Sequence, residues 1–247
     1  MKSLFLVLFF SSVMFAKTIS IGVASNVTYV IDELIKEFKK TDKNLNIRVN
    51  IGSSGKLVAQ TRRFAPYDIL ILANESYPMR LYKDGFSSIK PKVYASGTLS
   101  YFSISKNLLD VDMKSFLLSS KISKIAIANP KTAPYGIATI EVFKNIGILD
   151  RLKSKFVYAE SVSQTISYTM IATDIGVVAS SALYSDKMSK YKKGINYKKI
   201  DTTLYEPIKQ SAIILKEAIS DKDAMSFYKF LFSKKAKEIF KRNGYII

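Results

Sequence analysis

Hydroxyl and amide side chains gather at four points of this sequence, each directly after a short apolar run and before a helical pattern. These junctions are Ser25-Asn26-Val27-Thr28, Ser53-Ser54-Gly55, Thr132 to Gly136, and Ser161-Val162-Ser163. The first N–H groups of a helix have no partner inside it, so with a nearby side-chain donor they can bind an anion. At any single junction helix capping is the commoner explanation, because Ser and Asn are preferred caps. Four such junctions together predict one shared anion site.

The surrounding elements explain why the junctions should meet. Apolar runs alternate with amphipathic helical patterns along the chain, which is typical of an α/β architecture. A strand is predicted over Thr18 to Ala24, and a helix follows it. The further predicted strands that bear on the site are Leu45 to Ile51, Tyr67 to Ala73, Lys124 to Ala128 and Phe156 to Ala159. All four junctions lie at the carboxyl ends of predicted strands, where open α/β sheets place their ligands.

Uncharged donors at such a site favour particular anions. Each helix N-terminus supplies about half a positive charge, so four of them supply about two units against a dianion. A fully ionised oxyanion offers acceptors on every side, whereas hydrogen phosphate carries a proton that itself needs an acceptor. The residues therefore predict a preference for molybdate, tungstate or sulfate over phosphate, with the cavity radius deciding among the three.

Composition narrows the function further. The 247 residues contain no Cys and no His, which excludes thiolate catalysis, Cys-ligated zinc and triads built on histidine. Lys and Arg outnumber Asp and Glu by 38 to 20, a net charge of +18. These lysines are spread along the chain, whereas a nucleic-acid footprint should be clustered. We therefore expect no nucleic-acid partner and interpret the charge as a field that attracts anions.

The N-terminus has the layout of a secretory signal peptide. Met1-Lys2-Ser3 precedes an apolar run from Leu4 to Phe15, and Ala16 follows it. Residues 1–16 are predicted to be removed on export. We expect a periplasmic product without a lipid anchor, since such an anchor needs a cysteine.

One enzymatic alternative stays open. Ser53 and Lys56 have the Ser-x-x-Lys spacing of penicillin-recognising acyl enzymes, in which the lysine activates the serine. The same spacing recurs at Ser103 and Lys106, and the accompanying Lys-Thr-Gly element is absent. A secreted serine hydrolase is therefore the alternative, and our expectation is a protein that is not an enzyme.

Several segments resemble periplasmic molybdate-binding proteins. They are Gly52 to Leu57, Ala65 to Asp68, Asn129 to Gly136 and Glu160 to Thr165, in the same order across nearly the whole mature chain. The resemblance implies a two-lobed type II periplasmic binding protein of the α/β class. Each lobe would be a mainly parallel sheet flanked by helices, with the ligand cleft between the lobes. Lobe I would comprise residues 17–97 plus 208–247, and lobe II residues 98–207. Tyr94 to Ser103 and Gln210 to Leu215 are the expected crossings.

The resemblance also implies a set of ligand residues. Asn26 and Ser54 fall on side-chain ligands, and Tyr135 and Val162 fall on residues that bind through their backbone N–H groups. Three neighbouring residues could also bind the oxyanion: Ser25, Ser53 and Ser163. The oxyanion would be bound through its oxygens, so no protein group ligates the metal atom and no cofactor is expected. The implied partner is the permease of an ABC importer, and the protein would act as a monomer.

Two departures from the family pattern leave the choice of anion open. Some members supply a tyrosine hydroxyl after the strand that matches Ile175 to Ala179, whereas this chain has Ser180 and Ser181. Asn26 replaces a serine of many members, and an amide is longer and carries an acceptor as well as donors. Molybdate, tungstate and sulfate all remain possible at this point.

Overall fold

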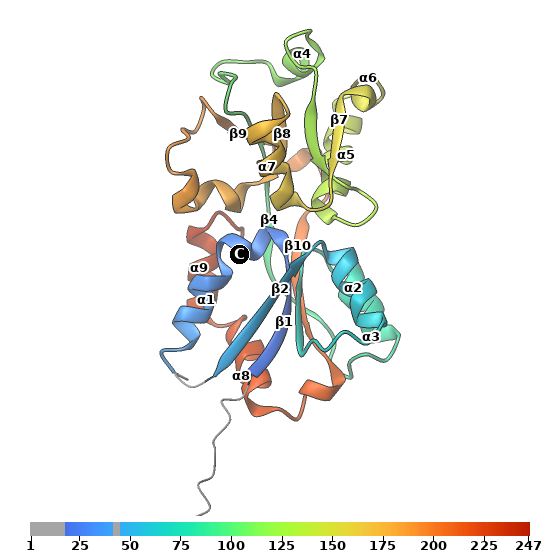
Figure 1. The fold of residues 1–247 in the computed structure, drawn as a ribbon, viewed down its shortest axis with the longest axis vertical. Helices are drawn as coiled ribbons and strands as arrows, with labels where there is room; N and C mark the ends of the chain where they lie inside the picture. The colour runs from blue at the N-terminus through green and yellow to red at the C-terminus, as the bar shows by residue number, and fades with distance from the viewer. Residues whose placement is uncertain (1–17, 42–44) are drawn as a thin grey trace, which may run out of the picture.

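The computed structural model describes residues 18–41 and 45–247 and arranges them as two lobes along one long axis (Figure 1). Each lobe contains a five-stranded mixed sheet with helices packed against it. The predicted signal peptide, residues 1–16, lies outside the described residues. Over residues 18–41 and 45–247 no helix is long and apolar enough to cross a membrane.

Lobe I contains the first and the last parts of the chain, drawn in blue and red (Figure 1). Its sheet has the order β2-β1-β3-β10-β4, and β10 is antiparallel to both of its neighbours, whereas β1 is parallel to β2 and β3. The strands are β1 (Thr18–Ala24), β2 (Asn46–Gly52), β3 (Ile69–Leu72), β4 (Lys92–Gly97) and β10 (Ile208–Ile214). The helices are α1 (Ile31–Phe38), α2 (Ser54–Arg62), α3 (Ser76–Lys83), α8 (Lys222–Phe230) and α9 (Lys234–Arg242), with short 3-10 helices η1 (Ser25–Tyr29) and η6 (Lys216–Ala218).

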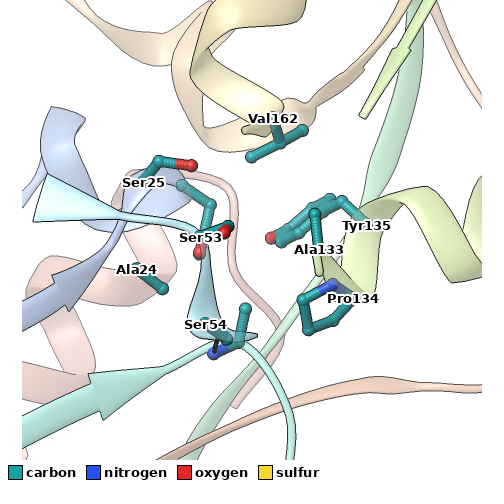
Figure 2. Close-up of a pocket in the computed structure, with 10 residues that line it drawn as sticks. Ala24, Ser25, Ser53, Ser54, Ala133, Pro134, Tyr135 and Val162 are labelled. Atoms are coloured by element: carbon teal, nitrogen blue, oxygen red, sulfur yellow. Dashed lines mark hydrogen bonds between the residues drawn. The ribbon is translucent and has the colours of Figure 1, made fainter. Parts of the chain in front are cut away.

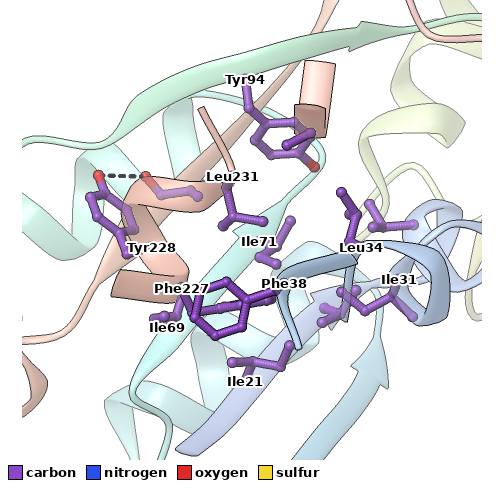
Figure 3. Close-up of a cluster of buried hydrophobic side chains, with 14 of the residues drawn as sticks. Ile21, Ile31, Leu34, Phe38, Ile69, Ile71, Tyr94, Phe227, Tyr228 and Leu231 are labelled. Atoms are coloured by element: carbon purple, nitrogen blue, oxygen red, sulfur yellow. Dashed lines mark hydrogen bonds between the residues drawn. The ribbon is translucent and has the colours of Figure 1, made fainter. Parts of the chain in front are cut away.

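Helices cover both faces of this sheet. The apolar spacing of α1 buries Ile31, Leu34 and Phe38, and Phe38 meets the Phe227 ring of α8 with centroids 5.2 Å apart (Figure 3). A separate cluster fills the space between the other face and α2 and α3. All four residues of β3 are buried, as expected for a strand covered on both sides.

Lobe II repeats the arrangement with the middle of the chain. Its sheet has the order β7-β6-β8-β5-β9, in which β6 is parallel to β7 and β8, and β5 is antiparallel to β8 and β9. The strands are β5 (Leu99–Phe102), β6 (Ile125–Ala128), β7 (Phe156–Ala159), β8 (Ile175–Ala179) and β9 (Tyr197–Lys199). The helices are α4 (Met113–Leu118), α5 (Pro134–Asn145), α6 (Leu149–Leu152) and α7 (Val162–Ile171), with 3-10 helices η2 (Lys153–Lys155), η3 (Ser180–Tyr184), η4 (Asp186–Met188) and η5 (Thr202–Leu204).

The chain passes between the lobes at places that match the prediction only in part. The predicted strand from Tyr94 to Ser103 is divided, so that β4 belongs to the first sheet and β5 to the second. The predicted crossing at Gln210 to Leu215 is wrong, because β10 lies wholly in the first sheet between β3 and β4. The return passes instead through residues 200–207. An apolar run of this length predicts a buried strand equally well in either place.

Candidate functional site

A small cavity lies at the junction of the two lobes (Figure 2). Its volume is about 10 Å³, far below the roughly 300–1,000 Å³ of sites that hold drug-sized ligands. All ten residues around it are buried: Ala24, Ser25, Asn26, Ser53, Ser54, Ala73, Ala133, Pro134, Tyr135 and Val162. The first six of these residues come from lobe I. The last four come from lobe II, where they lie at the starts of α5 and α7. The space therefore suits an inorganic ion better than an organic solute.

The four predicted junctions form the walls of this cavity. Helix η1 begins at Ser25 directly after β1, and α2 begins at Ser54 just after β2. From lobe II, α5 begins at Pro134 and α7 at Val162. The first N–H groups of each helix lack intrahelical acceptors. Six of the seven predicted site residues line this one cavity.

Ser54 has its hydroxyl proton left to donate. Its Oγ accepts a hydrogen bond from the Ala73 N–H at 2.9 Å, which fixes the oxygen at the edge of the cavity. Ser53 is also buried, and its Oγ has no hydrogen-bond partner among the described residues. A buried hydroxyl without a partner is uncommon in proteins. Both serines can therefore donate to a ligand.

Ser163 is the predicted residue that does not line the cavity. Its hydroxyl donates to the Ser25 carbonyl oxygen at 2.6 Å, so its proton is used in a contact between the lobes. The Gly55 N–H makes a second such contact, with the Thr132 carbonyl oxygen at 3.0 Å. These bonds join lobe I to lobe II on two sides of the cavity.

Asn26 lines the cavity, but both hydrogens of its amide are used elsewhere. Nδ2 donates to Gln210 Oε1 at 2.9 Å and to Tyr245 Oη at 3.0 Å. The amide oxygen Oδ1 is buried without a partner among the described residues. In this arrangement the Asn26 side chain cannot donate to an anion, and the donors that η1 offers are its main-chain N–H groups and the Ser25 hydroxyl.

The serines after β8 do not replace the tyrosine donor of other members at the cavity. Ser180 Oγ is hydrogen-bonded to Ser100 Oγ at 2.7 Å. Ser181 Oγ donates to the Asn26 carbonyl oxygen at 3.0 Å. Neither lines the cavity, and Ser181 instead adds a second contact from lobe II to η1, beside that of Ser163.

The walls carry no charged side chain. An ion pair between the lobes joins Lys56 Nζ and Glu160 Oε1 at 2.6 Å, and both side chains are more than half exposed. Burial raises the pKa of Tyr135 well above its ordinary value, so this phenol stays neutral. Lys56 is thus paired with Glu160, and Ser53 Oγ has no base bonded to it, which removes the geometric support for a serine hydrolase.

Sequence reasoning missed two groups of residues. Ala73 follows β3, and the carboxyl end of that predicted strand was a signal that could have identified it. Gln210 and Tyr245 stand behind the site and contact Asn26 from β10 and from the segment after α9. No local pattern marks either of them, because their role depends on segments more than 180 residues away in the chain.

Two lobes joined by two chain segments, with a small and uncharged cavity between them, define a two-lobed solute-binding protein. A family model described as bacterial extracellular solute-binding protein matches residues 19–246. The molybdate-binding protein ModA of Azotobacter vinelandii is 31% identical over 234 residues, which cover 93% of this chain and 90% of that protein. The chain therefore belongs to the bacterial extracellular solute-binding proteins, in the family of the ModA proteins.

Further comparisons agree with this assignment. The ModA protein of Rhodobacter capsulatus is 34% identical over 79% of this chain and 75% of its own length. The solved structure of the A. vinelandii periplasmic molybdate-binding protein has a TM-score of 0.84 and covers 93% of this chain and 99% of that one. The sulfate-binding protein SubI of Mycobacterium tuberculosis, with a TM-score of 0.78 and 11% identity, shares the fold.

Proposed function

We propose that this protein captures a tetrahedral oxyanion, molybdate or tungstate, and delivers it to the permease of an ABC importer. The observation that carries the proposal is the small, uncharged cavity at which the starts of three α-helices and of the 3-10 helix η1 meet from two lobes. Relatives named as molybdate-binding proteins support molybdate as the first candidate. Tungstate has the same shape and charge, so we include it.

The proposed contacts are hydrogen bonds without a salt bridge. Ser54 and Ser53 donate through their hydroxyls, Ser25 is a further hydroxyl at the wall, and Asn26, Tyr135 and Val162 donate through main-chain N–H groups. Partial positive charges at the N-termini of α2, α5 and α7 offset much of the charge of a dianion. Neutral donors fixed in space select one size of ion, whereas a lysine would attract any anion.

The setting of this function is part of the proposal. Residues 1–16 direct export and are removed, and the mature protein works in the periplasm as a monomer. Lobe I is residues 17–97 with 208–247, and lobe II is residues 98–207. The closed form docks on the membrane permease.

Competition calorimetry on the mature protein tests the ligand. Molybdate and tungstate should bind tightly, sulfate more weakly and phosphate least. Each bound ion should raise the melting temperature, because stabilisation grows as RT ln(1 + [L]/Kd). Tightest binding of sulfate would assign the site to sulfate instead. If no oxyanion binds or stabilises the protein, the proposed function is wrong.

A further inference from the structure

We propose that Gln210 is a positioning residue that ties the lobe I wall of the oxyanion site to its lobe II wall through one buried amide. This inference rests on the proposed function and concerns the same site. Gln210 lies on β10, is fully buried and does not line the cavity. It contacts the Asn26 side chain on one wall and the Tyr135 hydroxyl on the other.

Four hydrogen bonds surround this amide. Oε1 accepts from Asn26 Nδ2 at 2.9 Å and from Tyr94 Oη at 3.5 Å. Nε2 donates to the Ile208 carbonyl oxygen at 3.0 Å and to Tyr135 Oη at 3.4 Å. A single side chain thus contacts lobe I, lobe II and the β10 strand that leads back into lobe I.

The network fixes which way each amide points. The Ile208 carbonyl can only accept, so Nε2 of Gln210 must face it and Oε1 must face Asn26. Asn26 must then present Nδ2 to Gln210, which is the orientation observed. Tyr245 completes the arrangement, since its hydroxyl accepts from Asn26 Nδ2 and donates to the Asn26 carbonyl oxygen at 2.9 Å. The η1 turn is therefore held through both its side chain and its main chain.

Gly97 leaves the space that this link needs. A Cβ at this last residue of β4 would lie 2.0 Å from Tyr135 Oη and 2.7 Å from Gln210 Nε2. Any larger residue would displace the hydroxyl or the amide. The end of β4, where the chain leaves lobe I, is thus shaped around the Gln210–Tyr135 contact.

The link acts on the two main-chain donors that face each other across the cavity. Asn26 belongs to lobe I and Tyr135 to lobe II, and their N–H groups must be correctly separated to bind one ion. When the lobes part, Tyr135 moves with α5 while Gln210 stays with β10, so the hydrogen bond between them is made on closing. Gln210 therefore sets the geometry of the closed site without touching the ion.

Two single variants and their double variant test this role. Tyr135→Phe removes the acceptor on lobe II and keeps the main-chain N–H, and Gln210→Met keeps the volume without hydrogen bonds. Tyr135→Phe should raise the molybdate Kd about five- to ten-fold, as expected for one lost hydrogen bond. Gln210→Met should raise it at least as much, because it removes the same bond together with the bond to Asn26. The double variant should be no weaker than the weaker of the two single variants, because both remove the same link. Tyr94→Phe is the control, since Tyr94 contacts Gln210 but neither wall; its Kd should stay within two-fold.

The measurements are molybdate calorimetry and the melting temperature of each unliganded variant. Additive losses in the double variant, or a Tyr135→Phe Kd within two-fold of the parent, would overturn the positioning role. An equal loss of molybdate affinity in Tyr94→Phe would also overturn the positioning role. Such a loss would show that any change in the buried hydrogen-bond network weakens binding. Tyr135→Phe decides the matter alone if Gln210→Met does not fold. Failure of the parent protein to bind molybdate would instead count against the proposed function.

Discussion

Ser54 has only its proton left to offer a ligand, because its oxygen already accepts from the Ala73 N–H. Ser54→Ala should weaken molybdate binding by about 1–3 kcal/mol, since a donor to a buried charge is lost. Calorimetry measures the change, and Ser115→Ala at the exposed start of α4 is the control. Unchanged affinity in Ser54→Ala would place the ion somewhere other than this cavity.

Ser163 should behave differently, because its hydroxyl donates to the Ser25 carbonyl oxygen and not into the cavity. Ser163→Ala should speed the release of molybdate and of sulfate by the same factor, since a contact between lobes is indifferent to the size of the ion. Stopped-flow dissociation of both ions measures this. A change in the ratio of the two release rates would show that Ser163 contacts the ion after all.

The residues that sequence reasoning identified are those with a local signal. A hydroxyl after an apolar run and before a helical pattern can be recognised within a few positions of the sequence. Ser25, Ser53 and Ser54 could therefore be predicted as site residues. The partner of Ser163 lies 138 positions away, and that of Gln210 lies 184 positions from it. Which hydroxyl faces the cavity and which faces the other lobe depends on how two distant segments meet.

At the scale of elements, the start of α2 approaches the loop before α5 very closely. A Cβ on Gly55 would lie 2.9 Å from the Thr132 carbonyl oxygen and 2.9 Å from Tyr77 Oη. Gly55→Ala should therefore hold the lobes apart and weaken molybdate binding more than ten-fold, while the unliganded melting temperature changes little. Gly52→Ala is the control, because its Cβ would meet only flexible side chains, at 3.4 Å or more.

Small-angle scattering gives the readout for these two variants. Molybdate should shrink the radius of gyration of the parent protein and of Gly52→Ala but not of Gly55→Ala. If Gly55→Ala closes normally around the ion, the approach of α2 to lobe II has no part in closing.

Asp174 ties the start of β8 to the start of β6. Burial alone would raise its pKa, but hydrogen bonds from the N–H groups of Lys124 and Ser123 and from the Ser123 hydroxyl outweigh this and lower the pKa to about 2. An unfolded aspartate titrates near 3.9, so the stabilisation is present above pH 4 and is lost as the pH falls toward 2.

Urea unfolding at several pH values tests this anchor. The midpoint of the parent protein should fall between pH 4 and 2, and Asp174→Asn should be less stable at neutral pH and depend less on pH in that range. Parallel curves for the two proteins would mean that other carboxylates account for the acid sensitivity.

The order of helices and strands could largely be predicted from the sequence, but the path of the chain between the lobes could not. Continuous apolar runs such as β3 and the i, i+3, i+7 spacing of α1 follow from burial, which the sequence encodes directly. The same kind of apolar run at β10 correctly predicted a strand. The prediction that this strand crosses between the lobes was wrong. Crossing points depend on which sheet a strand joins, and that choice is made by long-range pairing.

At the scale of the whole molecule, the net charge of +18 acts on the ion before it is bound. The field of spread lysines should raise the association rate of a dianion at low ionic strength, and added salt should lower it. The dissociation rate should depend less on salt, because the cavity is buried and its walls are uncharged. Stopped-flow measurement over a salt series separates the two rates. A dissociation rate that rises as steeply as the association rate falls would indicate surface charges in direct contact with the ion.

The complete burial of all ten cavity residues also constrains how cargo is unloaded. While the lobes touch, little of the cavity wall is exposed to water, so we expect the frequency of lobe separation to limit how fast a bound ion escapes. On the proposed function, a stronger competing site on the importer would do little to release the ion as long as the lobes stay together. We therefore expect unloading to require that the importer separate the two lobes.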